Sequence, residues 1–254
     1  MLPTMLFLAA LFLGMLALLE AGRRLGRQRQ LGDTTAATGL GVVDGAVFGL
    51  MGLLIAFTFS GAAARFDARR ALIVEEANDI GTAWLRIDLL PDSLQPPIRE
   101  TFRQYLDARL AAYRAIPDMQ KVNAELARAT ALQGEIWSLS VAAARQVPGP
   151  TAGMLLLPAL NAMFDIATTR TMAAKTHPPM VIFGLLAALA LACSLMAGYG
   201  MAGSATRSWV HILGFAVILT ITVYVIMDLE YPRLGLIRVD AFDQVLVDVR
   251  ASMR

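Results

Sequence analysis

Four stretches without a charged side chain constrain this chain more than any other feature. The runs are Met1–Leu19, Gly45–Ala64, Pro178–Thr206 and the segment between Arg207 and Asp228. Since a helix needs about 20 residues to cross about 30 Å of hydrocarbon, each run is long enough to span a bilayer. We therefore expect four transmembrane helices, over residues 2–19, 41–64, 179–199 and 208–228.

Composition supports this expectation and excludes several classes of protein. The 254 residues are 57% apolar and 17% charged, whereas soluble domains carry about 25% charged residues. Such apolar content excludes a disordered chain, and the single Cys193 excludes an internal disulfide. The 22 Lys and Arg residues nearly balance the 20 Asp and Glu residues. A phosphate-tracking surface needs a basic excess, so we expect the lipid bilayer as partner and no nucleic acid.

Residues 66–178 differ in character from the four runs. They contain the balanced charge of an ordinary soluble domain, with apolar residues at helical spacing. The clearest helical series is Ile98, Phe102, Tyr105, Leu106, Leu110 and Tyr113. Proline and glycine at residues 90–97, 116–118 and 148–150 divide the segment into helices joined by short turns. We predict a helical, water-facing domain between the second and third spans.

The C-terminal segment, residues 229–254, follows the fourth span. Its apolar residues repeat at steps of three and four, at Val239, Phe242, Leu246, Val249 and Met253. This spacing predicts an amphipathic helix that needs a partner surface. The fold class is therefore all-α: a hairpin in residues 1–65, a helical domain, a hairpin in residues 179–228 and the tail.

The second span, GLGVVDGAVFGLMGLLIAFTFSGAAARFDARR, has two distinct faces. One face is a stripe of small residues, which lets helix backbones approach closely in lipid. The stripe consists of Gly41, Gly45, Gly49, Gly52, Ala56 and Ser60. It predicts close helix packing, either within one subunit or between subunits around a common axis.

The opposite face is apolar in the middle and has ionisable groups at both ends. It consists of Asp44, Val47, Met51, Leu54 and Thr58, followed by Arg65 and Arg69. Such a face can line a pore that gates by dewetting, and a lipid-facing stripe with interfacial charges has the same pattern. At the exit of the span, Arg65, Arg69 and Arg70 are candidates for raising the local anion concentration at a pore mouth.

An acidic group follows that exit. It consists of Glu75, Glu76 and Asp79. Salt bridges within a helical bundle and a divalent-cation site are the two interpretations, although no loop has the oxygen-ligand spacing of an EF-hand.

Enzyme chemistry has little support in the sequence. His177, His211 and Cys193 do not form a set at zinc spacing, and neither a P-loop nor a dinucleotide-binding motif is present. We therefore expect no catalytic residue, no metal and no cofactor.

Three long motifs carry a family resemblance. They are FTFSGAAARFDARRALIVEEANDIGTAWLRIDLLP, LLLPALNAMFDIATTR and YVIMDLEYPRLGLIRVDAFDQ. From about residue 40 to the C-terminus, the chain resembles the bacterial bestrophin-like membrane protein family, whose function is uncharacterised. It is more distantly similar to the bestrophin anion channels.

That resemblance implies an oligomer, a pathway and a location. Bestrophins are pentamers with four membrane helices per subunit, a helical cytosolic region and a pore lined by the second helix. The resemblance implies that Phe57 and Phe59 are the candidates for an aromatic neck of the pore. It also implies that small inorganic ions are the permeating species. It places the chain in the bacterial inner membrane, with the central domain and C-terminus in the cytoplasm. The alternative hypothesis is a non-conducting membrane scaffold or sensor whose helical domain and tail bind a partner.

Overall fold

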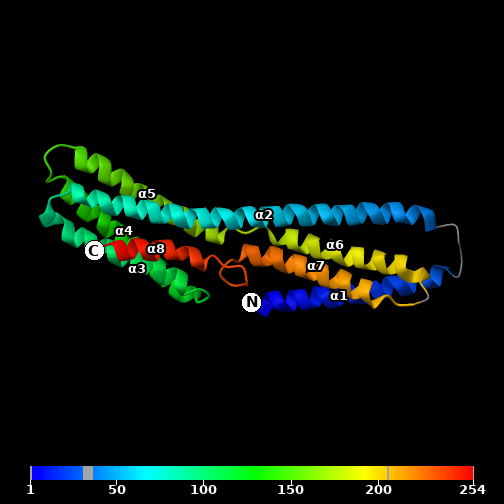
Figure 1. Cartoon of the computed structure of the whole chain (residues 1–254). Coiled ribbons are helices and arrows are strands. Elements are labelled where there is room, and N and C mark those ends of the chain that lie inside the picture. The colour runs from blue at the N-terminus through cyan, green and yellow to red at the C-terminus, as the bar shows by residue number, and fades with distance from the viewer. Residues whose placement is uncertain (1, 31–36, 205, 254) are drawn as a thin grey trace. The chain divides into compact units, whose positions relative to one another are not determined.

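The computed structural model describes residues 2–30, 37–204 and 206–253, and this part of the chain contains helices and no strand. The long helices are labelled in Figure 1. They are α1 (Leu2–Gln30), α2 (Ala37–Arg86), α3 (Gln95–Arg114), α4 (Met119–Ala144), α5 (Thr151–Lys175), α6 (Met180–Gly200), α7 (Trp209–Glu230) and α8 (Gln244–Ser252). Four short 3-10 turns also occur, at Ile87–Leu89, Asp92–Leu94, Met201–Gly203 (η3) and Asp240–Asp243 (η4). The all-α prediction is confirmed.

Four helical segments of the described chain are long and apolar enough to cross a membrane by length and composition. They are Thr4–Arg29, Gly41–Leu89, Thr151–Gly203 and Trp209–Glu230. The first of these helices is longer than the predicted span of residues 2–19, because α1 continues to Gln30.

The chain divides into two compact units. The first unit comprises Met1–Arg65 and His177–Tyr231, and the second comprises Phe66–Thr176 and Pro232–Arg254. Helix α2 is continuous through the boundary at residue 65. The C-terminal segment therefore folds with the helical domain, since its residues from Pro232 onward belong to the second unit.

In the first unit, α1 lies along α6 and also contacts α7 (Figure 1). Glycines set how closely α1 and α6 approach. A Cβ atom at Gly22 would lie 2.0 Å from the carbonyl oxygen of Leu195, and one at Gly198 would lie 2.1 Å from that of Leu19. No side chain larger than hydrogen fits at these distances, so the closest small-residue packing in this unit joins α1 to α6.

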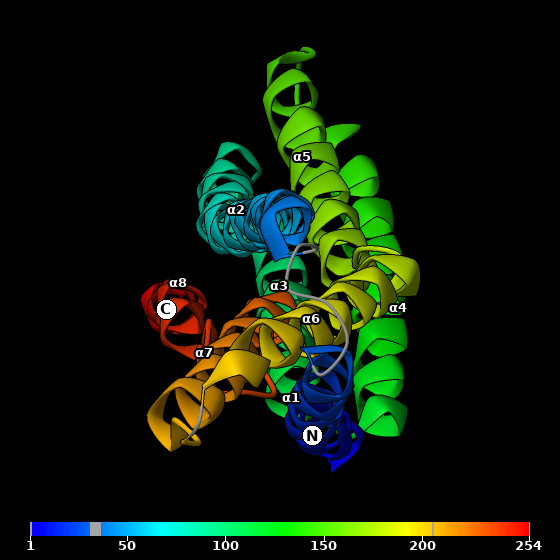
Figure 2. The same cartoon turned by 90° about the vertical axis from the view of Figure 1, so that its right-hand side faces the viewer.

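In the second unit, α4 packs against both α3 and α5 (Figure 2). The series predicted from helical spacing forms the core, because Phe102, Tyr105 and Leu106 are fully buried. The α3 helix begins with prolines in its first turn, and the Asp118 side chain accepts a hydrogen bond from the backbone N–H of Lys121 at 3.2 Å at the start of α4. Both helices begin where the prolines at residues 90–97 and 116–118 predicted a division between helices.

The predicted amphipathic tail finds its partner surface within the chain. Leu246 and Met253 are buried in the same core as α3. Arg103 on α3 donates to the carbonyl oxygen of Met253 at 3.0 Å, and Arg250 pairs with Asp107 at 2.8 Å. The apolar side of α8 is thus covered by the second unit itself.

Candidate functional site on helix α2

The part of α2 in the first unit has one covered and one open face. Met51 is 3% exposed and Ala62 is fully buried. Phe48 meets Phe215 of α7 in an edge-to-face ring contact with centroids 6.3 Å apart. Only 6% of the most apolar window of this helix is buried, compared with 28% for that of α1. Most of its surface in the first unit therefore faces outward from its own chain.

The open face carries the stripe of small residues. A Cβ atom at Gly41, Gly45, Gly49 or Gly52 would meet nothing within 4 Å, and Ala56 and Ser60 are exposed. Packing of this stripe against helices of the same subunit, one of the two interpretations, is therefore not found among the described residues. The close packing that such glycines permit needs a neighbouring backbone, and the described chain supplies one to Gly22 and Gly198 instead.

The opposite face, predicted as a possible pore lining, lies on the covered side. Met51 is buried, while Asp44, Val47, Leu54 and Thr58 are half-buried. Thr58 donates its hydroxyl hydrogen to the backbone, with Oγ1 lying 2.8 Å from the carbonyl oxygen of Leu54. Met51 is enclosed within its own chain, because α2 turns this side toward its own unit.

The two phenylalanines taken from the family resemblance lie on the open side. Phe57 is 69% exposed and Phe59 is 45% exposed. Side chains two residues apart on a helix point in different directions. Both remain accessible because the open face covers a wide part of the helix circumference.

Arg65, at the end of this part of α2, forms an ion pair with Glu230. Its Nε donates to Oε1 of Glu230 at 2.8 Å, and Nη2 donates to the same oxygen. The Glu230 side chain is fully buried, whereas that of Arg65 is 35% exposed. His177 lies 3.8 Å from the second carboxylate oxygen and stacks on Tyr231 with ring centroids 4.5 Å apart. A buried carboxylate thus offsets the charge predicted at a pore mouth.

Arg69 and Arg70 serve structural contacts in the second unit. Arg69 is buried and donates to the carbonyl oxygens of Ala173 and Thr176 at the end of α5, at 3.2 and 2.9 Å. These carbonyls have no partner within their helix, so a guanidinium there completes the helix end. Arg70 pairs with Asp67 at 3.0 Å and lies 4.2 Å from the ring centre of Phe242. Arg69 keeps its charge, because backbone carbonyls are neutral, but its side chain is buried, whereas the charge of Arg70 is paired with Asp67.

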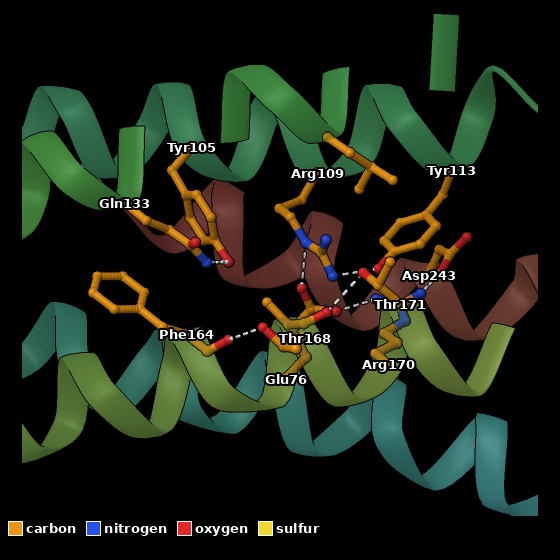
Figure 3. A network of polar contacts seen from close by, with 12 residues as sticks. Glu76, Tyr105, Arg109, Tyr113, Gln133, Phe164, Thr168, Arg170, Thr171 and Asp243 are labelled. Atoms are coloured by element: carbon orange, nitrogen blue, oxygen red, sulfur yellow. Dashed lines mark hydrogen bonds and ion pairs between the residues drawn. The ribbon is translucent and has the colours of Figure 1, made fainter. Parts of the chain in front are cut away.

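The acidic group divides into three different environments. Glu76 is fully buried and pairs with Arg109 and Arg170 (Figure 3). Glu75 is exposed, and Asp79 is half-buried. Burial, and then the nearby Glu75 carboxylate, raise the pKa of Asp79. Glu76 therefore forms salt bridges within the helical bundle, as one of the two interpretations expects. Among the described residues no cluster of three His, Cys, Asp or Glu side chains could hold a metal ion.

The buried network around Glu76 extends to the C-terminal segment. Arg170 bonds Asp243 at 2.8 Å, and Arg233 bonds the other oxygen of Asp243 at 2.7 Å. The Tyr113 ring lies 3.8 Å from the Arg170 guanidinium, and its hydroxyl accepts from Arg109 (Figure 3). Burial raises the pKa of Tyr113 to about 12. The hydroxyl therefore stays protonated, and the network holds α2, α3, α5 and the tail together.

Sequence reasoning missed most of this network, although one signal was present. Arg109 follows Tyr105 by four residues and precedes Tyr113 by four. It therefore lies on the apolar face of α3, where a charged side chain needs a buried partner. Arg170, Asp243 and Glu230 carry no comparable signal, because their partners are distant in sequence.

Comparison with known proteins places this architecture in a family. A model of the bestrophin-like domain matches residues 6–241. The chain belongs to the bestrophin-like family. None of the curated proteins matches it.

Two crystal structures show the fold of this bestrophin-like chain. Both are of a bacterial bestrophin homologue from Klebsiella pneumoniae, each with a single substitution. The first has 13% sequence identity and a TM-score of 0.59, and covers 95% of this chain and 97% of its own. The second has 12% sequence identity and the same TM-score, and the alignment covers 95% of this chain and 98% of the crystallised chain. At such identities the similarity establishes the bestrophin fold alone.

Proposed function

We propose that this chain is one subunit of a homo-oligomeric bestrophin-like ion channel that conducts anions along the open face of α2. The subunit number, five, and the preference for anions come from the family resemblance. The proposed location is the bacterial inner membrane, with the second unit and the C-terminus in the cytoplasm.

The observation that carries this proposal is the uncovered surface of α2. In lipid, helices associate through small residues that let backbones approach. In the described part of the subunit, a Cβ atom at any of the four glycines of the stripe would meet nothing within 4 Å, and Ala56 and Ser60 are exposed. A second copy of the chain is the proposed neighbour. Repeating that contact around an axis would place successive α2 helices in a ring, with the adjoining part of the open face toward the centre.

Phe57 is the proposed constriction of the pathway, since it is the most exposed aromatic side chain on this face. Apolar constrictions control conduction by dewetting. Phe59 points elsewhere on the helix and is proposed to contact the neighbouring subunit. Four half-buried residues are proposed to contribute less to the lining of the pathway: Asp44, Val47, Leu54 and Thr58. Met51 is not included in the proposed lining, because it is buried.

The mouth of the pathway has little free charge in this arrangement. Arg65 remains partly exposed, but Glu230 offsets its charge. We therefore propose that Arg65 attracts anions weakly and that apolar side chains supply most of the barrier.

The decisive experiment combines particle size with ion flux. The purified chain should form a ring-like oligomer in detergent, and liposomes containing it should pass chloride. Phe57→Ala should increase the flux, because a smaller side chain lowers the dewetting barrier. Ile218→Ala, at a 65% exposed position on α7, is the matched control and should leave the flux unchanged. A monomeric particle, or liposomes silent to several anions, would refute conduction.

The burial of the C-terminal tail weakens the alternative hypothesis of a membrane scaffold. The tail, offered as a partner-binding arm, packs its buried Leu246 and Met253 into its own chain. A silent oligomer that still captured a specific partner through the second unit would favour the scaffold over the channel.

A further inference from the structure

The end of α1 and the start of α7 gather positive charge in the first unit. The arginines there are Arg23, Arg24, Arg27, Arg29 and Arg207. Within residues 20–30 and 199–211, Glu20 is the only acidic residue in the sequence. These two segments therefore contain five arginines and one carboxylate.

Glu20 is already engaged by two of them. Its Oε1 accepts from Nε of Arg24 at 3.0 Å and from Nη2 of Arg207 at 2.9 Å. Arg27 donates to the carbonyl oxygen of Ser204 at 3.3 Å, which leaves most of its donors for another acceptor. The single acid cannot neutralise the group.

Arg23 is the unusual member of the group. The residue is 5% exposed, and its Nη1 atom is buried without a hydrogen-bond partner among the described residues. Arg27 and Arg207 lie near enough to repel it electrostatically, and Glu20, which is shared with Arg24 and Arg207, attracts it. A buried guanidinium with an unpaired nitrogen and like-charged neighbours is unfavourable unless an anion completes it.

The burial of Arg23 follows from the packing of α1. A Cβ atom at Gly26 would lie 2.5 Å from Cβ of Ala202 and 2.8 Å from the carbonyl oxygen of Tyr199. Together with Gly22, this glycine presses the end of α1 against α6 and η3. Arg23 is buried and lies between these two glycines in the sequence, on a helix whose position is set by this packing. We expect less ordering of the site when an anion binds, which favours tight binding.

We propose that Arg23, Arg27 and Arg207 bind a phosphate group where α1 ends and α7 begins. Guanidinium groups match phosphate oxygens with paired hydrogen bonds. Trp209 begins α7, is exposed, and lies beside Arg207 with 5.7 Å from the guanidinium to its ring. Tryptophan at a span end marks the depth of lipid headgroups. The headgroup of an anionic phospholipid and free phosphate are two sources of this chemistry.

The test measures melting temperature and bound lipid for the full-length chain. In nanodiscs, replacing phosphatidylcholine with phosphatidylglycerol should raise the melting temperature, and native mass spectrometry should find phosphatidylglycerol retained. Arg23→Gln should lose the temperature gain and retain about tenfold less phosphatidylglycerol, as expected when charge-assisted hydrogen bonds are removed. Arg29→Gln is the matched control, because it removes the same charge from an exposed position on α1 and should behave as the unsubstituted chain.

Two further measurements of melting temperature identify the source of the phosphate and test the unpaired charge of Arg23. Without anionic lipid or phosphate, Arg23→Gln should melt at or above the temperature of the unsubstituted chain, because it removes an unpaired buried charge. Millimolar inorganic phosphate in detergent tests the soluble source. A gain from lipid alone supports the headgroup, and an equal gain from phosphate supports the soluble anion.

Three results would overturn the site. The first is the absence of any gain with lipid or phosphate. The second is an equal gain in the Arg23→Gln variant and in the unsubstituted chain. The third is an Arg23→Gln variant that changes the oligomeric state but not lipid retention, since that would assign Arg23 to a contact between subunits.

Discussion

Glu76 on α2 and Arg109 on α3 form a buried ion pair, with Nε of Arg109 2.6 Å from Oε1 of Glu76. Arg170 of α5 engages the other carboxylate oxygen. Burial alone would raise the pKa of Glu76, but attraction to Arg109 and Arg170, and their hydrogen bonds, lower it below the usual value of 4.5. The carboxylate is therefore charged in the folded protein and joins three helices of the second unit.

Glu76→Gln should destabilise the protein strongly. The amide leaves Arg109 and Arg170 buried with less compensating charge, and breaking such a pair costs about 3–5 kcal/mol. Denaturant titration in detergent, followed by the fluorescence of the buried Trp84, measures the change. Glu75→Gln is the control, because Glu75 is exposed; its effect should stay within about 0.5 kcal/mol. Equal stability of both variants would contradict the role given to Glu76.

Stability should fall in acid because of the same carboxylate. The folded pKa of Glu76 is below its usual value, so its contribution is present above about pH 4.5 and is lost as pH falls through the folded value. Asp79 acts in the opposite sense, since its raised pKa favours the protonated form in the folded state. Melting temperatures measured from pH 7 downward should drop below about pH 4.5. The drop should be smaller in Glu76→Gln, and an identical drop would rule out Glu76 as its source.

Gly198→Ala should loosen the contact between α1 and α6. The new Cβ would lie 2.1 Å from the backbone oxygen of Leu19, which a rigid helix cannot move cheaply. Overpacking of this kind costs about 1–3 kcal/mol. Thermal unfolding of the purified protein measures it. Gly184→Ala on the same helix has nothing within 4 Å of the new Cβ and should be neutral or stabilising by up to about 1 kcal/mol.

Leu246→Ala tests whether the tail belongs to the core of the second unit. Leu246 is fully buried, and truncating a buried leucine costs about 2–5 kcal/mol. Leu85→Ala, at a 66% exposed position on α2, should change stability by less than about 0.5 kcal/mol. Both variants are compared by denaturant titration. A tail that is dispensable for folding would make the two substitutions equivalent.

The sequence by itself determined the features that depend on local patterns. Charge-free runs located the apolar helices, since an unpaired charge in hydrocarbon is costly over any stretch of about 20 residues. Prolines marked the divisions before the helices that begin at Gln95 and Met119, because the effect of proline on the backbone is local. The apolar series of α3 and the tail predicted which sides are buried, and Phe102 and Leu246 are buried accordingly.

Only the tertiary structure decided which surfaces meet. A glycine permits close approach but does not name its partner, so the stripe on α2 and the pair Gly22 and Gly26 were equally able to pack, and α6 covers only the latter. Arginines at a span end look free in sequence, yet Arg65 meets Glu230 across 165 positions. Ion pairs of that separation depend on where helices are brought together, and a one-dimensional pattern does not contain that information.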